Sequence, residues 1–301
     1  SVATGGVLTF DSAPNYEDEI CGGDNSCVVV LQVTDGANTD TITVTVNLQD
    51  VNEFSPVFGD ADGDGESSTA TATPNENQQA VGTYAATDAD GSATQTYSIL
   101  TAAQNAASVD HDLFSVGAGG VLAFSSAPDF ETPGCGAGDN SNTCAVVIQV
   151  TDGANTDTIT VTVTVQDLND ETPAFTSSGT PSINENVRNV LTLAASDTDA
   201  GDSATFAITG GADSELFEID GGTTLRFAAA AGANYESPGD AGTNNEYVVV
   251  VTATDTGANA VAQTITITIQ DVNEFSPEFG DGATATATPN ENQQAVGTYA
   301  A

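Results

Sequence analysis

The chain has 301 residues, with 43 Asp and Glu against 2 Lys and Arg, so its formal net charge is −41. Arg188 and Arg226 are its only Arg or Lys residues. Repulsion among the remaining carboxylates opposes a compact state unless solvent cations or high salt offset it. Nucleic acids and anionic membranes are not expected as partners, because both are bound through Lys and Arg. No apolar run of about 18 residues exists, so direct membrane insertion is not expected.

The composition also argues against an enzyme. The chain lacks Lys, and its single His, His111, lies in the polar stretch 108–112. A Ser-His-Asp triad would have to include His111, which we expect in a solvated loop. The absence of Trp disfavours a sugar-stacking surface, although 6 Tyr leave an enzyme or sugar-binding domain as an alternative of another class.

Alternation of apolar and polar residues predicts three strand–turn–strand units. In chain order the paired segments are 28–33 with 41–46, 145–150 with 158–165, and 247–252 with 264–269. Thr in 158–165 would face outward and Ile or Val inward. Gly and Asn in the intervening segments are typical of hairpin turns. No long segment has a helical period, so the predicted fold class is all-β, with β-sandwich domains.

Long segments of the sequence recur. Residues 32–46 reappear unchanged at 149–163, and residues 69–86 at 284–301. The repeat of about a hundred residues matches a sandwich domain rather than a solenoid unit. The predicted domains are 1–55 (the C-terminal part of a repeat), 56–172 and 173–276 (complete repeats) and 277–301 (the start of another). We expect this sequence to be a window on a longer tandem array.

Acidic residues recur at the same points of each repeat. Their order is a Glu, an Asp-X-Asp pair, an Asn/Asp-X-Glu pair, an Asp before a turn, and an Asp-X-Asn linker. Carboxylate and amide oxygens are the ligands that Ca²⁺ prefers, and clustered His and Cys of the kind that zinc would favour are lacking. The alternative is the solvated acidic surface of a halophilic sandwich, but unconstrained surface acids would not keep this order.

This ordered set resembles the cadherin repeat, and the resemblance covers the whole chain. It implies Greek-key sandwich domains of the Ig-like kind, with Ca²⁺ as the cofactor at each domain junction. The sequence departs from the family in its linkers, where Phe54 and Phe275 stand at a position that the family fills with Asn. Phe cannot ligate a cation, so one site in each of these linkers is in doubt. Asn15 and Asn234 replace an Asp and would offer a neutral carbonyl.

The resemblance implies three sets of calcium ligands. The first junction would use Glu17, Asp50, Asn52 and Glu53 with Asp88, Asp90 and Asp152. The second would use Glu76, Asp129, Glu131, Asp167, Asn169 and Asp170 with Asp197, Asp199 and Asp255. The third would use Glu185, Glu236, Asp271, Asn273 and Glu274. About three ions at each junction would offset less than half of the net charge.

An acidic insertion, Asp60–Glu66, lies near the start of the second repeat and is absent from the copy at 280–283. It begins like an EF-hand loop, but Thr71 occupies the twelfth position, where that loop has Glu. A flexible acidic loop is favoured over an additional weak calcium site.

The four cysteines allow three pairings. Cys21 and Cys27 occupy the same place in the first repeat as Cys135 and Cys144 in the second, which favours the bridges Cys21–Cys27 and Cys135–Cys144. Free thiols or an atypical metal site are the alternatives. Paired cysteines indicate an oxidising, extracellular setting at the cell surface.

The predicted function is a calcium-rigidified extracellular tandem-repeat array with a structural or adhesive role. Its expected partners are neighbouring repeats or other copies of the chain, with a surface ligand as a further option. The alternative is a self-assembling filament subunit without a specific receptor. That alternative predicts end-to-end or strand-sharing contacts between chains.

Overall fold

The computed structural model describes residues 1–59, 68–90, 94–136, 140–199, 201–278, 284–289, 291 and 294–298. These residues form an all-β structure whose only helical segments are three short 3₁₀ turns, as the sequence predicts. They contain no helix long and apolar enough to cross a bilayer. The chain divides into two compact units, Ser1–Leu168 and Asn169–Ala301. The four-part division of the sequence stays a prediction.

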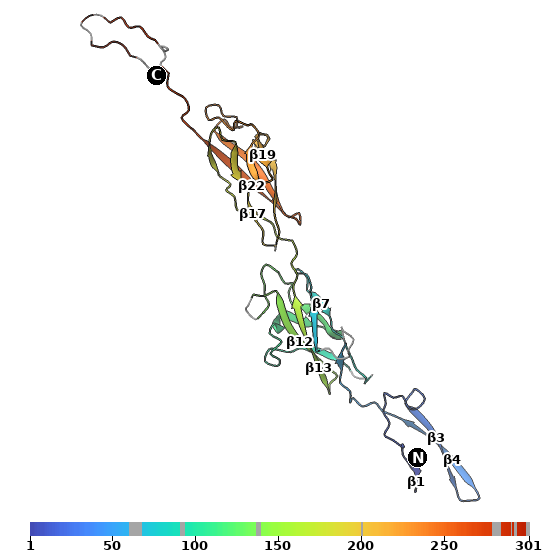
Figure 1. Cartoon of the computed structure of the whole chain (residues 1–301). Helices are drawn as coiled ribbons and strands as arrows, with labels where there is room; N and C mark the ends of the chain where they lie inside the picture. The colour runs from blue at the N-terminus through green and yellow to red at the C-terminus, as the bar shows by residue number, and fades with distance from the viewer. Residues whose placement is uncertain are drawn as a thin grey trace. The chain divides into compact units, whose positions relative to one another are not determined.

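The first unit contains a complete sandwich (Figure 1). A four-stranded sheet has the order β6-β13-β12-β9, a three-stranded sheet has the order β10-β11-β7, and β5 pairs with β8. The strands are β5 (Val57–Phe58), β6 (Thr69–Ala72), β7 (Ala80–Thr83), β8 (Ala86–Thr87), β9 (Thr96–Ile99), β10 (Phe114–Val116), β11 (Val121–Phe124), β12 (Thr143–Thr151) and β13 (Thr156–Thr164).

The β12–β13 hairpin supplies one wall of this core. Ile159 and Val161 of β13 are buried and the intervening Thr160 is only half-buried, which confirms the predicted alternation. Asp152 shapes the turn because its Oδ1 accepts hydrogen bonds from the backbone N–H groups of Ala154 at 2.7 Å and Asn155 at 2.6 Å.

The three-stranded sheet supplies the opposite wall. Leu122 is fully buried on β11, and the rings of Phe114 and Phe124 stack with centroids 4.6 Å apart. His111 begins the 3₁₀ turn η1 (His111–Leu113), and its imidazole Nδ1 lies 3.0 Å from the carbonyl oxygen of Ser108. Its side chain is 23% exposed, so the histidine is more enclosed than the expected solvated loop position.

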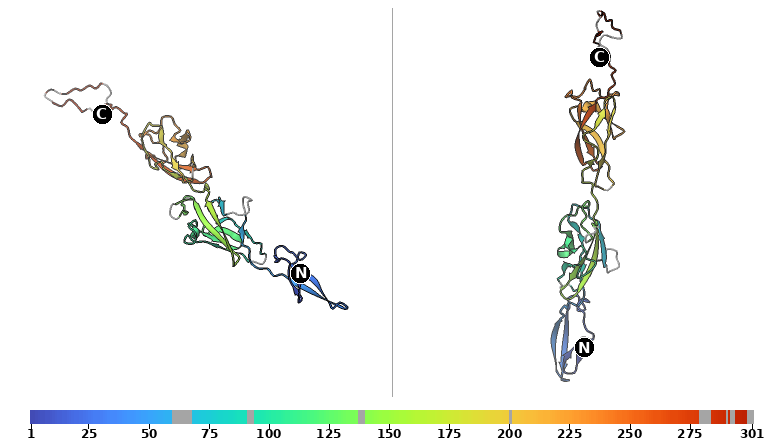
Figure 2. Two further views of the ribbon diagram at one scale, coloured as in Figure 1. Left: turned by 60° about the horizontal axis from the view of Figure 1, so that its bottom comes forward. Right: turned by 90° about the vertical axis from the view of Figure 1, so that its left-hand side faces the viewer.

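The second unit repeats this architecture (Figure 2). Its sheets have the orders β15-β22-β21-β18 and β16-β20-β19, and β14 pairs with β17. The strands are β14 (Ala174–Phe175), β15 (Ser182–Asn184), β16 (Asn189–Thr192), β17 (Ala195–Ser196), β18 (Thr205–Gly210), β19 (Phe217–Asp220), β20 (Thr224–Phe227), β21 (Glu246–Thr254) and β22 (Ala260–Gln270). Tyr247 packs edge-on against Phe227 in its core, with centroids 5.2 Å apart.

The first 50 residues form two hairpins, β1 (Val2–Ala3) with β2 (Val7–Leu8) and β3 (Ser26–Thr34) with β4 (Thr39–Asn47). The β3–β4 hairpin shares the unchanged 15-residue segment with β12–β13. Its environment differs, since Ile42 is 62% exposed whereas the equivalent Ile159 is 2% exposed. The apolar face that β13 buries is therefore less covered on β4, where Val44 and Val46 are half-buried.

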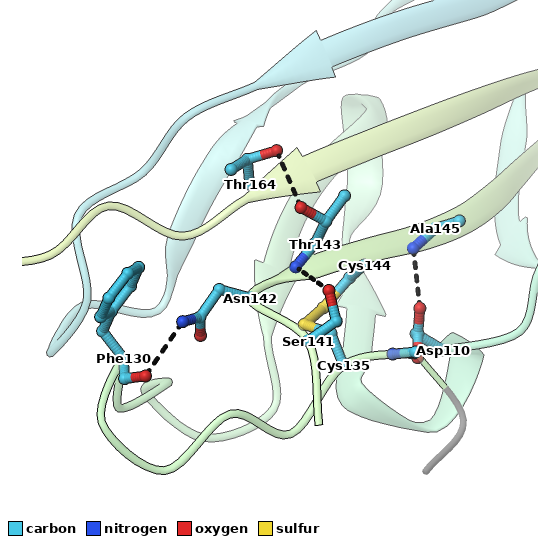
Figure 3. Close-up of a disulfide and its surroundings, with 10 residues drawn as sticks. Asp110, Phe130, Cys135, Ser141, Asn142, Thr143, Cys144, Ala145 and Thr164 are labelled. Atoms are coloured by element: carbon cyan, nitrogen blue, oxygen red, sulfur yellow. Dashed lines mark hydrogen bonds between the residues drawn. A yellow bond between two sulfur atoms is a disulfide. The ribbon is translucent and has the colours of Figure 1, made fainter. Parts of the chain in front are cut away.

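Both favoured disulfides are present, Cys21–Cys27 and Cys135–Cys144. Figure 3 shows the second at the start of β12, beside the hydrogen bond that the Thr143 backbone N–H donates to Ser141 Oγ. Each bridge ties an irregular loop to a long central strand. The acidic insertion Asp60–Glu66 lies outside the described residues, and the described part of 277–301 contains no strand.

Candidate metal sites

Four carboxylates gather where the first repeat ends. Glu17, Asp50, Glu53 and Asp90 each place one oxygen within 4.8 Å of the others. Both carboxylate oxygens of Glu17 are buried and accept no hydrogen bond from the described residues. Burial of an anion without donors is costly, so a cation is the counter-charge that would suit this cluster.

A second cluster shares one member with the first. Asp88, Asp90 and Asp152 approach one another within the same 4.8 Å, so Asp90 belongs to both groups. Phe54 contributes through its backbone, since its N–H donates to Asp90 Oδ2 at 2.8 Å. Sequence analysis missed this contact because it considered only the Phe side chain.

The Asn52 amide lies beside this pair of clusters. With its nitrogen turned toward the carboxylates, it donates to Asp152 Oδ2 at 2.9 Å and Asp90 Oδ2 at 3.3 Å. With its oxygen turned toward them, it adds one more oxygen ligand. Asn52 can therefore either donate hydrogen bonds to the carboxylates or offer an oxygen ligand to a cation, depending on the orientation of its amide.

Electrostatics at these two clusters differ between members. Desolvation, together with the charges of Glu17, Asp90 and Asp50, raises the pKa of Glu53. Backbone N–H groups of the turn, first that of Asn155, lower the pKa of Asp152. The turn therefore favours the ionised form of Asp152, whereas the crowded negative charge disfavours the ionised form of Glu53.

The C-terminal end of the second repeat carries another cluster, formed by Glu76, Glu131 and Asp167. Glu76 is only 2% exposed, and its two oxygens accept from the backbone N–H groups of Phe130 at 2.7 Å and Leu168 at 2.8 Å. Asp129 Oδ1 accepts from the Thr132 N–H at 3.0 Å, which fixes the turn next to Glu131.

The third repeat reproduces this arrangement with Glu185, Glu236, Asp271 and Glu274. Glu185 accepts from the N–H groups of Tyr235 and Val272, each at 2.9 Å, and these bonds lower its pKa. Desolvation and the charges of Glu185 and Glu236 raise the pKa of Glu274. Asn273 is exposed in the same linker.

Further predicted ligands lie at the start of the second unit. Asp199 and Asp255 are buried, Asp197 is half-buried, and Asn169 and Asp170 are exposed. The Asn169 amide donates to Asp202 Oδ2 at 2.8 Å. Hydrogen bonds, first from the Thr256 hydroxyl, lower the pKa of Asp202, a residue that sequence analysis missed because it lies outside the repeated motif.

All of these clusters consist of oxygen donors, which suits a hard divalent cation such as Ca²⁺. Their members come from the predicted ligand sets. The grouping of Glu76, Glu131 and Asp167 with Asp197, Asp199 and Asp255 in one junction stays a prediction.

The sequence and fold of this chain are similar to those of known proteins. No family model matches the chain. Human Protocadherin-16 is 30% identical over 288 residues, which span 85% of this chain and 8% of that protein. Human Protocadherin Fat 4 is 27% identical over 264 residues, which span 83% of this chain and 5% of that protein. The chain thus spans less than a tenth of either relative.

Solved structures of protocadherin extracellular domains have a similar fold. The Protocadherin GammaB4 extracellular domain is similar over 93% of this chain and 42% of its own, at 22% identity and a TM-score of 0.58. Mouse Protocadherin-24 EC1-3 is similar over 90% of this chain and 86% of its own, at 19% identity and a TM-score of 0.53. The chain is cadherin-like. Its sandwiches have the cadherin ectodomain fold, and the predicted extracellular location is confirmed by these relatives.

The ion, the mechanism and the partner are matters of proposal.

Proposed function

We propose that this cadherin-like chain is an extracellular spacer whose domains are stiffened by Ca²⁺, with a structural or adhesive role at the cell surface. The observation that carries the proposal is Asp90, which belongs to two carboxylate clusters at once. One cluster takes its other members from residues 17–53, and the other from Asp88 and Asp152 of the following sandwich. Cations bound there would tie the two segments together.

The uncompensated charge supplies the mechanism. Glu17 has two buried oxygens without a hydrogen bond, and the pKa of Glu53 is raised in the same cluster. Without a cation these carboxylates repel one another and favour separation of the two segments. Ca²⁺ accepts six to eight oxygens at 2.3–2.6 Å, so it converts the repulsion into a cross-link.

The expected affinity for Ca²⁺ follows from the extracellular setting. Extracellular calcium modules bind at about 10⁻⁴–10⁻³ M, which matches calcium outside the cell rather than inside it. Both disulfides fit the same oxidising compartment. Neighbouring repeats and other copies of the chain are the proposed partners, with a surface ligand as a further one.

Small-angle scattering coupled to size-exclusion chromatography tests this function on the monomeric fraction. We expect the maximum dimension to increase and its spread to narrow in about 1–5 mM Ca²⁺, and both changes to reverse in EGTA. Mg²⁺ at the same ionic strength is the control for screening. Identical scattering in Ca²⁺ and EGTA would show that calcium does not stiffen the chain.

A further inference from the structure

An asparagine directly precedes the long central strand of each repeat. Asn25, Asn142 and Asn245 come immediately before β3, β12 and β21. The side-chain amide of each asparagine donates a hydrogen bond to a backbone carbonyl earlier in the chain. The bonds run from Asn25 to Tyr16 at 2.7 Å, from Asn142 to Phe130 at 3.0 Å and from Asn245 to Tyr235 at 3.0 Å. Figure 3 shows the bond from Asn142 to Phe130 in the surroundings of the second disulfide.

The accepting carbonyl belongs to the residue that precedes a cluster carboxylate. The clusters contain Glu17, Glu131 and Glu236, and the residues before them are Tyr16, Phe130 and Tyr235. The carbonyl of Phe130 and the N–H of Glu131 lie in one planar peptide unit, so a hydrogen bond to the carbonyl also restricts the Glu131 backbone. In the second and third repeats the N–H of the same aromatic residue donates to another cluster member, Glu76 at 2.7 Å or Glu185 at 2.9 Å. The aromatic residue is therefore bound at both its N–H and its carbonyl.

The backbone of the same asparagine binds the segment that leads into the linker. Its carbonyl accepts a hydrogen bond from a residue two positions before the linker Asp in every repeat. These bonds run from the N–H of Leu48 to Asn25 at 2.9 Å, of Val165 to Asn142 at 2.8 Å and of Ile269 to Asn245 at 2.9 Å. The linker residues that follow are Asp50, Asp167 and Asp271, which belong to the three clusters. One asparagine thus connects the two chain segments that carry the Glu and the Asp of each cluster.

The conformation of a turn does not account for these asparagines. Asn25 and Asn245 adopt positive φ, at 54° and 63°, which Asn tolerates better than most residues. Asn142 does not adopt positive φ, yet its amide makes the same hydrogen bond. The Oδ1 atoms of Asn25 and Asn245 are buried and accept no hydrogen bond from the described residues. The amide nitrogen is therefore the side-chain atom that all three positions use.

We propose that Asn25, Asn142 and Asn245 are positioning residues of the calcium sites. Each fixes the cluster Glu relative to the linker Asp, so that the two carboxylates are already spaced before a cation binds. Loss of a residue that orients a metal ligand typically lowers metal affinity by about 10- to 100-fold. These asparagines bind the backbone beside the ligand rather than the ligand itself, so we expect the lower end of that range. The effect on affinity rests on the proposed calcium function, whereas the restraint on the loop does not.

Nuclear magnetic resonance of the whole chain tests the proposal in the second repeat. Asn142→Ala removes the amide at a position without positive φ. Ser141→Ala is the control, because Ser141 Oγ accepts a bond within the loop, from the Thr143 N–H at 3.0 Å. In EGTA we expect the Phe130 amide to exchange with solvent about fivefold faster in Asn142→Ala, and within about twofold of the unaltered chain in Ser141→Ala. In a Ca²⁺ titration followed by the Glu131 signal, Asn142→Ala should weaken binding about tenfold and Ser141→Ala by less than about twofold.

The third repeat supplies the reciprocal test, which also decides the matter if Asn142→Ala does not fold. Asn245→Gly removes the amide and tolerates positive φ. Its neighbour gives the matched control Asn244→Gly, since the Asn244 amide donates to Glu246 at 3.1 Å rather than to the segment that carries Glu236. Asn245→Gly should weaken Ca²⁺ binding about tenfold at Glu236 and leave it unchanged at Glu131, and Asn244→Gly should leave both unchanged.

The outcomes separate the positioning role from the calcium function. Affinity that a control lowers as much as the asparagine variant beside it would overturn the proposal, as would equal exchange of the Phe130 amide in Asn142→Ala and Ser141→Ala. Absence of Ca²⁺ binding by the unaltered chain would overturn the calcium function and this proposal together. Normal Ca²⁺ binding by the asparagine variants would overturn this proposal alone.

Discussion

At the scale of single residues, two neighbouring glycines beside β11 differ in how closely another chain segment approaches them. Gly119 and Gly120 both adopt positive φ, at 72° and 75°. A Cβ at Gly120 would lie 1.8 Å from the carbonyl oxygen of Tyr84, whose N–H donates to the Gly120 carbonyl at 2.8 Å. A Cβ at Gly119 would meet nothing within 4 Å. Only the second glycine is thus required for contact between chain segments.

This pair of glycines gives a matched test. Gly119→Ala should cost about 1–2 kcal/mol of unfolding free energy, since only the left-handed backbone is penalised. Gly120→Ala bears the same penalty and also displaces the Tyr84 backbone, so we expect a loss of about 4 kcal/mol or more. Urea unfolding followed by circular dichroism measures both values. Equal losses would mean that the two segments do not pack this closely.

At the scale of strands, identical sequences occupy different environments. The 15 residues shared by β3–β4 and β12–β13 form the same hairpin in both places, because alternation and turn chemistry are local properties. Burial is not local, since it depends on the strands that pack opposite. The buried face of β13 is therefore only partly covered on β4.

Truncation of one equivalent residue in each hairpin measures that difference. Ile159→Ala should lower the unfolding free energy by about 2–5 kcal/mol, because it removes a fully packed side chain. Ile42→Ala should change it by about 0.5 kcal/mol or less, as at exposed sites. Denaturant titration in EGTA provides the comparison. A large effect of Ile42→Ala would show that this side chain is packed rather than exposed.

The sequence predicted the six long strands, the two disulfides and the members of the acidic clusters, since each depends on a pattern that recurs within the chain. It did not predict how those members are held. The two N–H groups that bind Glu76 belong to Phe130 and Leu168, whose side chains carry no motif chemistry. Likewise the contact from Phe54 N–H to Asp90 follows from the linker backbone, and Asp202 lies outside the repeat.

At the scale of the whole molecule, the charge balance singles out the acidic clusters. The only two Arg residues share one carboxylate, with Arg188 Nη2 at 2.9 Å and Arg226 Nε at 2.7 Å from Glu218 Oε1. Both lie on the β16-β20-β19 sheet or the turn that enters it, where Glu218 and Asp220 rather than a cluster member balance them. The two arginines therefore pair away from the carboxylate clusters, and the proposed calcium function would connect those clusters to the net charge of −41.

Calorimetric titration of the chelator-treated chain with Ca²⁺ tests this account most directly, with Glu17→Gln and its neighbour Asp18→Asn as variants of matched charge. Glu17 has two buried oxygens without hydrogen bonds, whereas Asp18 is exposed. We predict saturable binding at about 10⁻⁴–10⁻³ M. Glu17→Gln should weaken it and raise the midpoint of thermal unfolding in EGTA, while Asp18→Asn changes neither. No saturable binding up to about 10 mM, or equal weakening by both variants, would contradict the account.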